Sequence, residues 1–273
     1  MMSSNAAQSG YAEVNGITLY YEIHGTGQPL VLLHGGLGAI EMFGAVLHAL
    51  AATHQVIGVD LQAHGRTADI DRPLRYETMA DDVAALIAQL GFDRAAVMGY
   101  SLGGGVALQI AIRHPEVVEK LVVVSAPYRR DGWYSEVLAG MNQMGAHAAE
   151  PMKQTPMYQL YSTIAPRVEG WPILLAKTGD LLRQDYNWSA EVATLTMPTL
   201  LVIGDADSVS PAHAAAFFAL LGGGKGDAGW DHAGMTPHRL AILPGVTHFD
   251  SFSTPALPPV VVAFLDSPLP VRV

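Results

Sequence analysis

The sequence contains no cysteine, which excludes disulfide bonds, thiolate metal sites and a cysteine nucleophile. Positive charge is scarce: 15 Lys and Arg stand against 25 Asp and Glu, and no basic stripe of the kind that binds nucleic acid is visible. No apolar run approaches the ~20 residues that a membrane span requires. The first residues, 1–5, lack the basic start and apolar core of a secretory signal. We therefore expect a cytoplasmic protein with no nucleic-acid partner and no membrane span.

What is present is an alternation of short apolar runs with helix-like segments, in a chain of 273 residues that can form one large α/β domain. Continuous apolar strands separated by helices predict a largely parallel sheet covered on both faces. The predicted strands are 17–23, 29–33, 55–59, 95–98, 120–125, 199–203 and 240–243, and the predicted helices include 40–52, 79–90 and 102–114.

The segment Gly99-Tyr100-Ser101-Leu102-Gly103 joins one of these strands to the helix that follows. A serine at the apex of a sharp strand-to-helix turn is the arrangement of a nucleophile elbow. A side chain at Gly99 or Gly103 would crowd that turn. We therefore predict that the Ser101 hydroxyl is held beyond the carboxyl edge of the sheet as a nucleophile.

A serine nucleophile needs a histidine base, and the base needs an orienting acid. His248 is the best-placed histidine, because it follows the predicted strand 240–243 in a loop. Asp205 and Asp207 both follow the predicted strand 199–203, and chain position alone does not separate them. Of the other histidines, His114 ends a helix, where we expect it to cap carbonyl groups.

Residues 127–195 interrupt the alternation, because they are rich in Met, Tyr and Trp and contain no clear strand. We interpret them as a helical cap, with residues 1–126 and 196–273 as the core. Most of the aromatic side chains would form a small satellite core, and a few would line an apolar pocket over the active site. Methionine suits a pocket that adapts to varied ligands.

Four features occur in the order typical of the α/β-hydrolase superfamily, and the chain resembles its ester-hydrolase and haloperoxidase-like branch with a helical cap. These features are His34-Gly35-Gly36, the turn from Asp60 to Gly65, the Ser101 elbow, and the pair Asp207 and His248. The resemblance implies an α/β fold with a mostly parallel eight-stranded sheet. No metal-ligand cluster or dinucleotide-binding fingerprint is visible in the sequence, so we expect no cofactor and no metal. The resemblance also implies Ser101, Asp207 and His248 as the catalytic residues, and an oxyanion hole formed by the backbone N–H groups of Gly36 and Leu102, with Leu37 as the fallback for Gly36.

Two stretches depart from the family's pattern. Gln62-Ala63 stands where relatives often have Arg-Gly, which places the subfamily in question but leaves the triad intact. His34 and His64, which flank these motifs, are interpreted as loop-structuring. The segment Gly222–Trp230 lacks the spacing and the closing Ser or Thr of a phosphate-binding loop, so we expect a surface insertion.

These observations predict a serine hydrolase that cleaves a small or medium carboxylic ester or lactone through an acyl-enzyme. A serine at the elbow disfavours dehalogenases and epoxide hydrolases, which place an aspartate there in this family. The alternatives on the same triad are a C–C bond hydrolase, a perhydrolase or haloperoxidase-like enzyme, and a hydroxynitrile lyase. A ligand-binding receptor with vestigial hydrolysis is a further alternative, as is an amidase or iminopeptidase with Glu136 or Glu150 as an acidic subsite.

Overall fold

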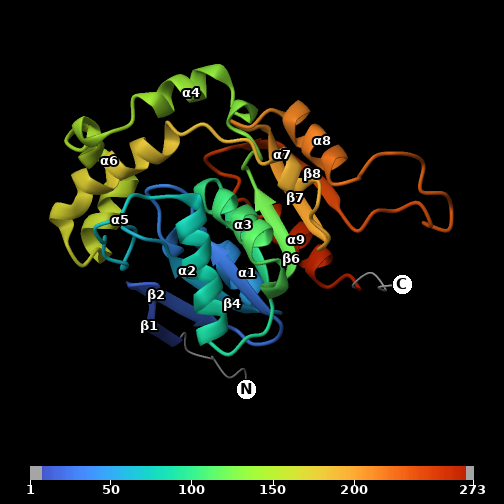
Figure 1. Cartoon of the computed structure of the whole chain (residues 1–273), viewed down its shortest axis with the longest axis horizontal. Coiled ribbons are helices and arrows are strands. Elements are labelled where there is room, and N and C mark those ends of the chain that lie inside the picture. The colour runs from blue at the N-terminus through green and yellow to red at the C-terminus, as the bar shows by residue number, and fades with distance from the viewer. Residues whose placement is uncertain (1–7, 269–273) are drawn as a thin grey trace.

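The computed structural model of the protein describes residues 8–268, and its centre is an eight-stranded sheet (Figure 1). The strand order is β1-β2-β4-β3-β5-β6-β7-β8, and every neighbouring pair from β4 to β8 is parallel. The strands are β1 (Gln8–Val14), β2 (Ile17–His24), β3 (Pro29–Leu33), β4 (Gln55–Asp60), β5 (Ala95–Tyr100), β6 (Val118–Val124), β7 (Thr199–Ala206) and β8 (Arg239–Thr247). The predicted eight-stranded, mostly parallel sheet is confirmed. Residues 1–5, on which the expectation of no secretory signal depends, lie outside the described residues.

Strand β1 has no counterpart among the predicted ranges. It forms an antiparallel hairpin with β2 through Asn15 and Gly16, whose φ angles are 47° and 79°. Two successive positive φ values are typical of the type I′ turn, for which Asn-Gly is a preferred sequence. This dipeptide was therefore the signal for the missed strand.

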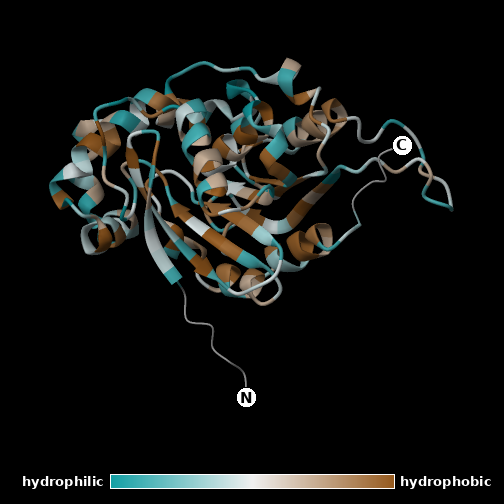
Figure 2. Ribbon diagram, turned by 60° about the horizontal axis from the view of Figure 1, so that its bottom comes forward, coloured by the Kyte–Doolittle hydropathy of each residue, from teal (hydrophilic) through white to brown (hydrophobic). Residues whose placement is uncertain are grey.

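Helices cover both faces of the sheet. Successive residues of each strand point to opposite sides, so a continuous apolar strand presents apolar side chains to both faces. On one face, Val31 and Leu33 pack in the core cluster that includes side chains of α2, α3 and α8. On the other face, Leu30 and Leu32 pack with side chains of α1 and α9. These helices are α1 (Ala45–Ala51), α2 (Tyr76–Gln89), α3 (Leu102–Arg113), α8 (Pro211–Leu220) and α9 (Leu257–Leu265). Figure 2 shows the apolar strands enclosed between helices.

The predicted helix 40–52 is divided in two. Gly44, at φ 46°, separates the 3-10 helix η1 (Ile40–Phe43) from α1. The remaining 3-10 helices are η2 (Pro115–Val117), η3 (Arg130–Gly132), η4 (Ala146–Ala148), η5 (Pro151–Gln154) and η6 (Val168–Gly170).

The segment between β6 and β7 adds helices and no strand to the eight-stranded sheet. It contains α4 (Ser135–Asn142), α5 (Pro156–Ile164), α6 (Trp171–Leu182) and α7 (Ser189–Val192). Helices α4, α5 and α6 lie together at one side of the sheet (Figure 1). The Trp171 ring packs against Tyr158 and Tyr161 with centroids 5.4 and 5.2 Å away. The expectation of a separate satellite core was wrong, because these rings join the same core cluster as the side chains of α2 and α3.

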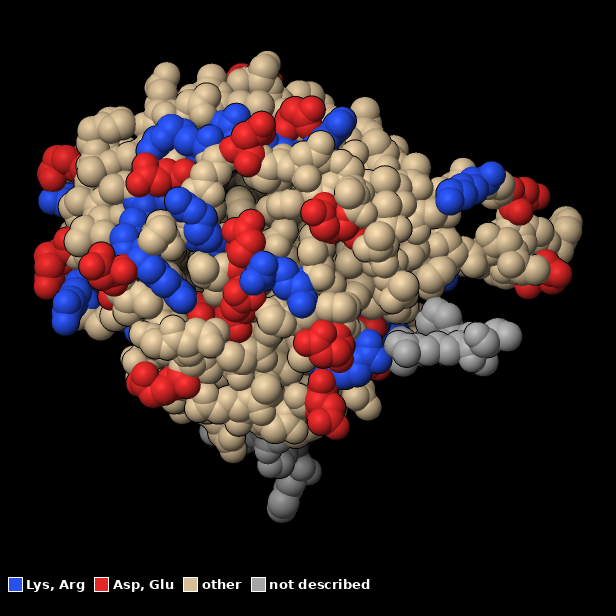
Figure 3. Space-filling view, viewed as in Figure 1, with Lys and Arg blue, Asp and Glu red and all other residues tan. Residues whose placement is uncertain are grey.

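Charges of both signs are mixed on the face of the molecule that Figure 3 shows. Within residues 8–268, no helix combines the length and apolarity needed to cross a membrane. The predicted insertion Gly222–Trp230 lies in a loop between α8 and β8 that extends away from the sheet (Figure 1), and its Trp230 side chain is fully exposed.

Candidate active site

Ser101 occupies a sharp turn between β5 and α3. Its backbone has φ 52° and ψ −114°, a conformation that residues with a side chain rarely adopt. A Cβ atom on Gly99 would lie 2.0 Å from the carbonyl oxygen of Gly103, and one on Gly103 would lie 2.4 Å from that of Leu33. The two glycines are thus required because backbone atoms occupy the space of any side chain.

The structure brings Ser101, Asp207 and His248 together. His248 Nε2 lies 3.1 Å from Ser101 Oγ, and His248 Nδ1 lies 2.9 Å from Asp207 Oδ1. Asp207 directly follows β7 and His248 directly follows β8. The carboxyl ends of these neighbouring parallel strands therefore place both residues at the edge where β5 presents Ser101. A carboxylate accepts the Nδ1–H, which leaves Nε2 free to accept the serine proton.

Strand β8 is longer than the predicted 240–243, and this extension positions the base. It continues through Pro244 to Thr247, with a register shift against β7 between Gly204 and Ala206. Proline is tolerated in an edge strand because its missing N–H can face away from the neighbouring strand. Strand β7 likewise extends past Ile203 to Ala206.

Asp207 is held by a dense set of donors. The Ser125 hydroxyl donates to Oδ2, the N–H of Val209 donates to Oδ1 at 3.1 Å, and the N–H of Gly204 donates to Oδ2 at 3.2 Å. Burial raises the pKa of the Asp207 carboxyl, but the hydrogen bonds, that from His248 foremost, outweigh burial and lower the pKa overall. The carboxylate therefore stays ionised beside the imidazole at neutral pH.

Asp205 has a different place. Its side chain is exposed, and its Oδ1 accepts the N–H of Gly245 at 2.8 Å in the bend of β8. The geometry thus separates the two aspartates that chain position left equal, since only Asp207 reaches His248.

Tyr100 and Ser251 hold the backbone of His248, a role that the sequence did not predict for either residue. The Tyr100 hydroxyl donates to the His248 carbonyl oxygen at 2.8 Å, and its ring lies 5.3 Å from the imidazole. The Ser251 hydroxyl donates to the same carbonyl at 3.1 Å. Burial raises the pKa of Tyr100, so its hydroxyl keeps its proton. Tyr100 precedes the nucleophile in the motif, but spacing alone gives no sign that it reaches residue 248.

Gly36 and Leu102 lie next to each other beside the nucleophile. A Cβ on Gly36 would contact Leu102 Cδ1 at 3.6 Å, and a Cβ on Gly35 would lie 3.5 Å from Ser101 Cβ. Gly36 is exposed. Leu102 is the first residue of α3, where the N–H has no partner within the helix and the helix dipole is positive. Leu37, the fallback, is buried with a φ of 60°.

His34 and His64 organise the loops that carry Gly36. The His34 Nδ1–H donates to the Gly35 carbonyl at 2.8 Å, and His34 Nε2 accepts the N–H of Leu61 at 3.0 Å. The two imidazoles lie 5.0 Å apart, and burial lowers the pKa of His34 to about 3 and that of His64 to about 4. Both rings are therefore neutral and structural.

Gln62, which replaces the arginine frequent in the family, lies in a buried polar network. Its amide donates to Asp69 at 3.0 Å and to the Arg72 carbonyl at 3.1 Å, and it accepts from Arg72 Nε at 2.7 Å. Lys177 of α6 binds the same Asp69 carboxylate at 2.6 Å. Gln62 thus helps to connect the core to α6, because it binds the same Asp69 carboxylate as Lys177.

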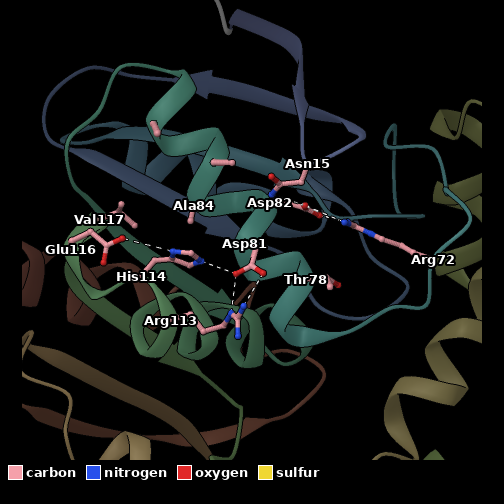
Figure 4. Close-up of a pocket in the computed structure, with 12 residues that line it drawn as sticks. Asn15, Arg72, Thr78, Asp81, Asp82, Ala84, Arg113, His114, Glu116 and Val117 are labelled. Atoms are coloured by element: carbon pink, nitrogen blue, oxygen red, sulfur yellow. Dashed lines mark hydrogen bonds and ion pairs between the residues drawn. The ribbon is translucent and has the colours of Figure 1, made fainter.

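The expectation that His114 caps carbonyl groups was wrong. Its Nε2 lies 2.7 Å from Asp81 of α2, because the end of α3 packs beside that helix. The pair belongs to an open hollow of about 600 Å³ along α2 (Figure 4). Arg113 also binds Asp81 there, and Arg72 binds Asp82. The triad residues do not line this hollow.

Within residues 8–268, no group of three His, Asp or Glu side chains is arranged to hold a metal ion.

Comparison with known proteins agrees with this fold. A family model described as the alpha/beta hydrolase fold matches residues 28–146. RutD of Azorhizobium caulinodans, which is provisionally named a carbamate hydrolase, is 29% identical over 224 residues, covering 77% of this chain and 84% of RutD.

Two solved structures are similar in fold. A membrane phospholipase A, described as a bacterial virulence factor, superposes with a TM-score of 0.74 at 20% identity, covering 95% of this chain and 86% of the other. The carboxylesterase CesB of Bacillus subtilis superposes with a TM-score of 0.71 at 19% identity, covering 96% and 92%. With its eight-stranded sheet and a family model that matches residues 28–146, the chain has the α/β-hydrolase fold.

Proposed function

We propose that the protein is a serine hydrolase that cleaves a small or medium carboxylic ester or lactone through an acyl-enzyme. The observation that carries the proposal is the hydrogen-bonded chain from Asp207 through His248 to Ser101, with contacts of 2.9 and 3.1 Å. The Ser101 side chain is half-buried and therefore accessible, whereas the base and the acid are nearly or fully covered.

In the first half of the reaction, Ser101 Oγ attacks the acyl carbon while His248 Nε2 takes its proton. The N–H groups of Gly36 and Leu102 would stabilise the oxyanion, and each donor of this kind lowers a barrier by roughly 3–4 kcal/mol. His248 returns the proton to the leaving alcohol, and Asp207 stabilises the imidazolium. Water, activated by the same imidazole, then releases the carboxylic acid.

Residues 127–195 would serve as a helical cap over the core formed by 1–126 and 196–273. The position of α4, α5 and α6 beside the core and the anchoring of α6 through Lys177 support this role. We also propose that the protein is cytoplasmic and requires no cofactor.

Carbamate hydrolysis is the second candidate, favoured by the similarity to RutD. A carbamate offers the same attack on a carbonyl carbon, so the triad and the oxyanion donors would act in the same way.

The test is turnover of 4-nitrophenyl acetate by the wild type, by Ser101→Ala and by the control Ser135→Ala, whose side chain is exposed on α4. We expect turnover by the wild type and the control, and none above background by Ser101→Ala. A fluorophosphonate should label the wild type once and leave Ser101→Ala unlabelled. Equal turnover by the wild type and Ser101→Ala would contradict the proposal, as would the absence of any ester hydrolysis. A carbamate with the same leaving group then ranks the two substrate classes by kcat/KM.

A further inference from the structure

An aromatic surface begins directly beside the catalytic imidazole. The Trp133 ring lies 5.3 Å from the His248 ring, centroid to centroid, at an interplanar angle of 78°. The Trp133 Nε1–H donates to the Tyr186 hydroxyl at 3.4 Å, and the Tyr186 ring stacks on Trp188 at 4.3 Å. Trp133 is 8% exposed and Tyr186 is half-buried, so each ring keeps part of its area uncovered by the protein.

Tyr76 continues this surface toward the nucleophile. Its ring makes edge contacts with Tyr186 at 5.7 Å and with Trp188 at 5.4 Å. A Cβ on Gly105 would lie 2.6 Å from Tyr76 Cε1, so the Tyr76 ring rests on the first turn of α3, which follows Ser101. We call Trp133, Tyr186, Trp188 and Tyr76 the aromatic wall, because together they extend from the base to the helix of the nucleophile.

Backbone pairing holds the aromatic wall in place. An antiparallel bridge joins Arg129 to Asn187, and so ties the chain segment that carries Trp133 to the one that carries Tyr186 and Trp188. A second bridge joins Trp133 to Val209, whose N–H binds the Asp207 carboxylate. A wall fixed to the acid's own loop is pre-organised, and binding to it costs little conformational entropy.

We propose that the aromatic wall binds a planar aromatic group of the substrate, so that the protein prefers esters that carry a benzene ring close to the scissile bond. This inference rests on the proposed hydrolase function. Aromatic rings attract one another in edge-to-face and offset geometries beyond what burial of their area provides. Each such contact favours a benzene ring over a saturated ring of the same size by roughly two- to tenfold.

Matched pairs of esters test this preference. Ethyl phenylacetate against ethyl cyclohexylacetate varies the ring on the acyl side, and benzyl acetate against cyclohexylmethyl acetate varies it on the alcohol side. We expect the wild type to show a kcat/KM ratio of roughly ten in favour of the aromatic member of at least one pair. Trp133→Leu and Tyr186→Leu should bring that ratio close to one, whereas Trp133→Phe should retain most of it. Trp230→Leu is the control, because its indole is fully exposed on the loop after α8, and it should keep the wild-type ratio.

A ratio near one in the wild type, or an unchanged ratio in both leucine variants, would overturn the inference. Circular dichroism shows whether each variant folds. Binding can also be measured directly, without any substitution in the wall. The full-length Ser101→Ala protein is titrated by calorimetry with phenylacetate and benzyl alcohol, and with their cyclohexyl analogues. At least one aromatic ligand should bind roughly tenfold more tightly than its analogue, and equal affinities in both pairs refute the role of the wall.

The two proposals fail in different ways. If the wild type hydrolyses no ester, the proposed function is wrong, and the titration alone decides whether the wall selects aromatic rings. If esters are hydrolysed without aromatic preference and the ligands bind equally, the wall inference is wrong while the hydrolase proposal stands.

Discussion

The backbone of Ser101 gives a prediction about stability that is independent of the substrate. At φ 52° and ψ −114°, a residue with a Cβ is strained, at a cost of roughly 1–3 kcal/mol. Two backbone hydrogen bonds impose this conformation. The Ser101 N–H donates to the Val124 carbonyl at 2.9 Å, and the Gly105 N–H donates to the Ser101 carbonyl at 3.1 Å. Substitution by glycine should release the strain, because glycine adopts positive φ readily.

The comparison that isolates this effect is Ser101→Gly against Ser101→Ala. Both variants lack the hydroxyl, but only alanine keeps the Cβ that is strained. Glycine also gains about 0.5–1 kcal/mol of conformational freedom in the unfolded chain. The difference between the midpoints of the two ranges leaves Ser101→Gly more stable than Ser101→Ala by about 1 kcal/mol, measured as the free energy of unfolding in urea.

Ala88→Gly supplies the control, because residue 88 is exposed in α2 with helical backbone. There, glycine should destabilise the protein by about 0.5–1 kcal/mol. If Ser101→Gly proves less stable than Ser101→Ala by a similar amount, the elbow stores no strain and the reasoning fails.

Three further predictions concern the triad and the α6 anchor. Asp207→Asn should lower kcat/KM by about 10⁴-fold, because an amide favours the wrong tautomer of His248. The folded-state pKa of Asp207 is lowered, so the ionised carboxylate stabilises the fold above about pH 4 and loses this effect at lower pH. The unfolding free energies of wild type and variant should therefore converge in acid. Tyr100→Phe should cost about 0.5–1.5 kcal/mol of stability in urea unfolding, and no more, because the Ser251 hydroxyl still serves the His248 carbonyl. Lys177→Met should cost about 1–3 kcal/mol in the same assay, because the ammonium also serves two backbone carbonyls.

Each of these has a matched check. A kcat/KM for Asp207→Asn within tenfold of wild type contradicts the role of the acid. For Tyr100→Phe, the double variant with Ser251→Ala should lose more stability than the two single losses added together, because it leaves the carbonyl unsatisfied; simple additivity contradicts the shared acceptor. Lys153→Met, at a more exposed ion pair, should change stability by less than about 0.5 kcal/mol, and an equal effect of the two lysine variants would remove the special role of Lys177.

Much of the fold could be predicted from local pattern. Continuous apolar runs separated by helical segments predict a parallel sheet, because only strands buried on both faces are apolar throughout. The nucleophile could also be predicted from local pattern. Gly99 and Gly103, on either side of Ser101, must be glycine because nearby backbone atoms occupy the space of a side chain. Element ends were less well predicted, since the added length of β7 and β8 depends on pairing between the two strands.

Contacts between distant parts of the chain could not be predicted in this way. Asp205 and Asp207 both follow the predicted strand 199–203, and their partners differ in the folded chain. Asp205 accepts the backbone N–H of Gly245 in the bend of β8, whereas Asp207 contacts the His248 imidazole. Tyr100, 148 residues before His248, reaches its carbonyl only after the sheet has formed. The sequence by itself determined seven of the eight strands, the elbow and the residue types of the triad, because these depend on periodicity and on sterics within a few residues. The tertiary structure alone placed an acid against the base and decided which aromatic rings surround it, because those contacts exist only once distant strand ends meet at one edge of the sheet.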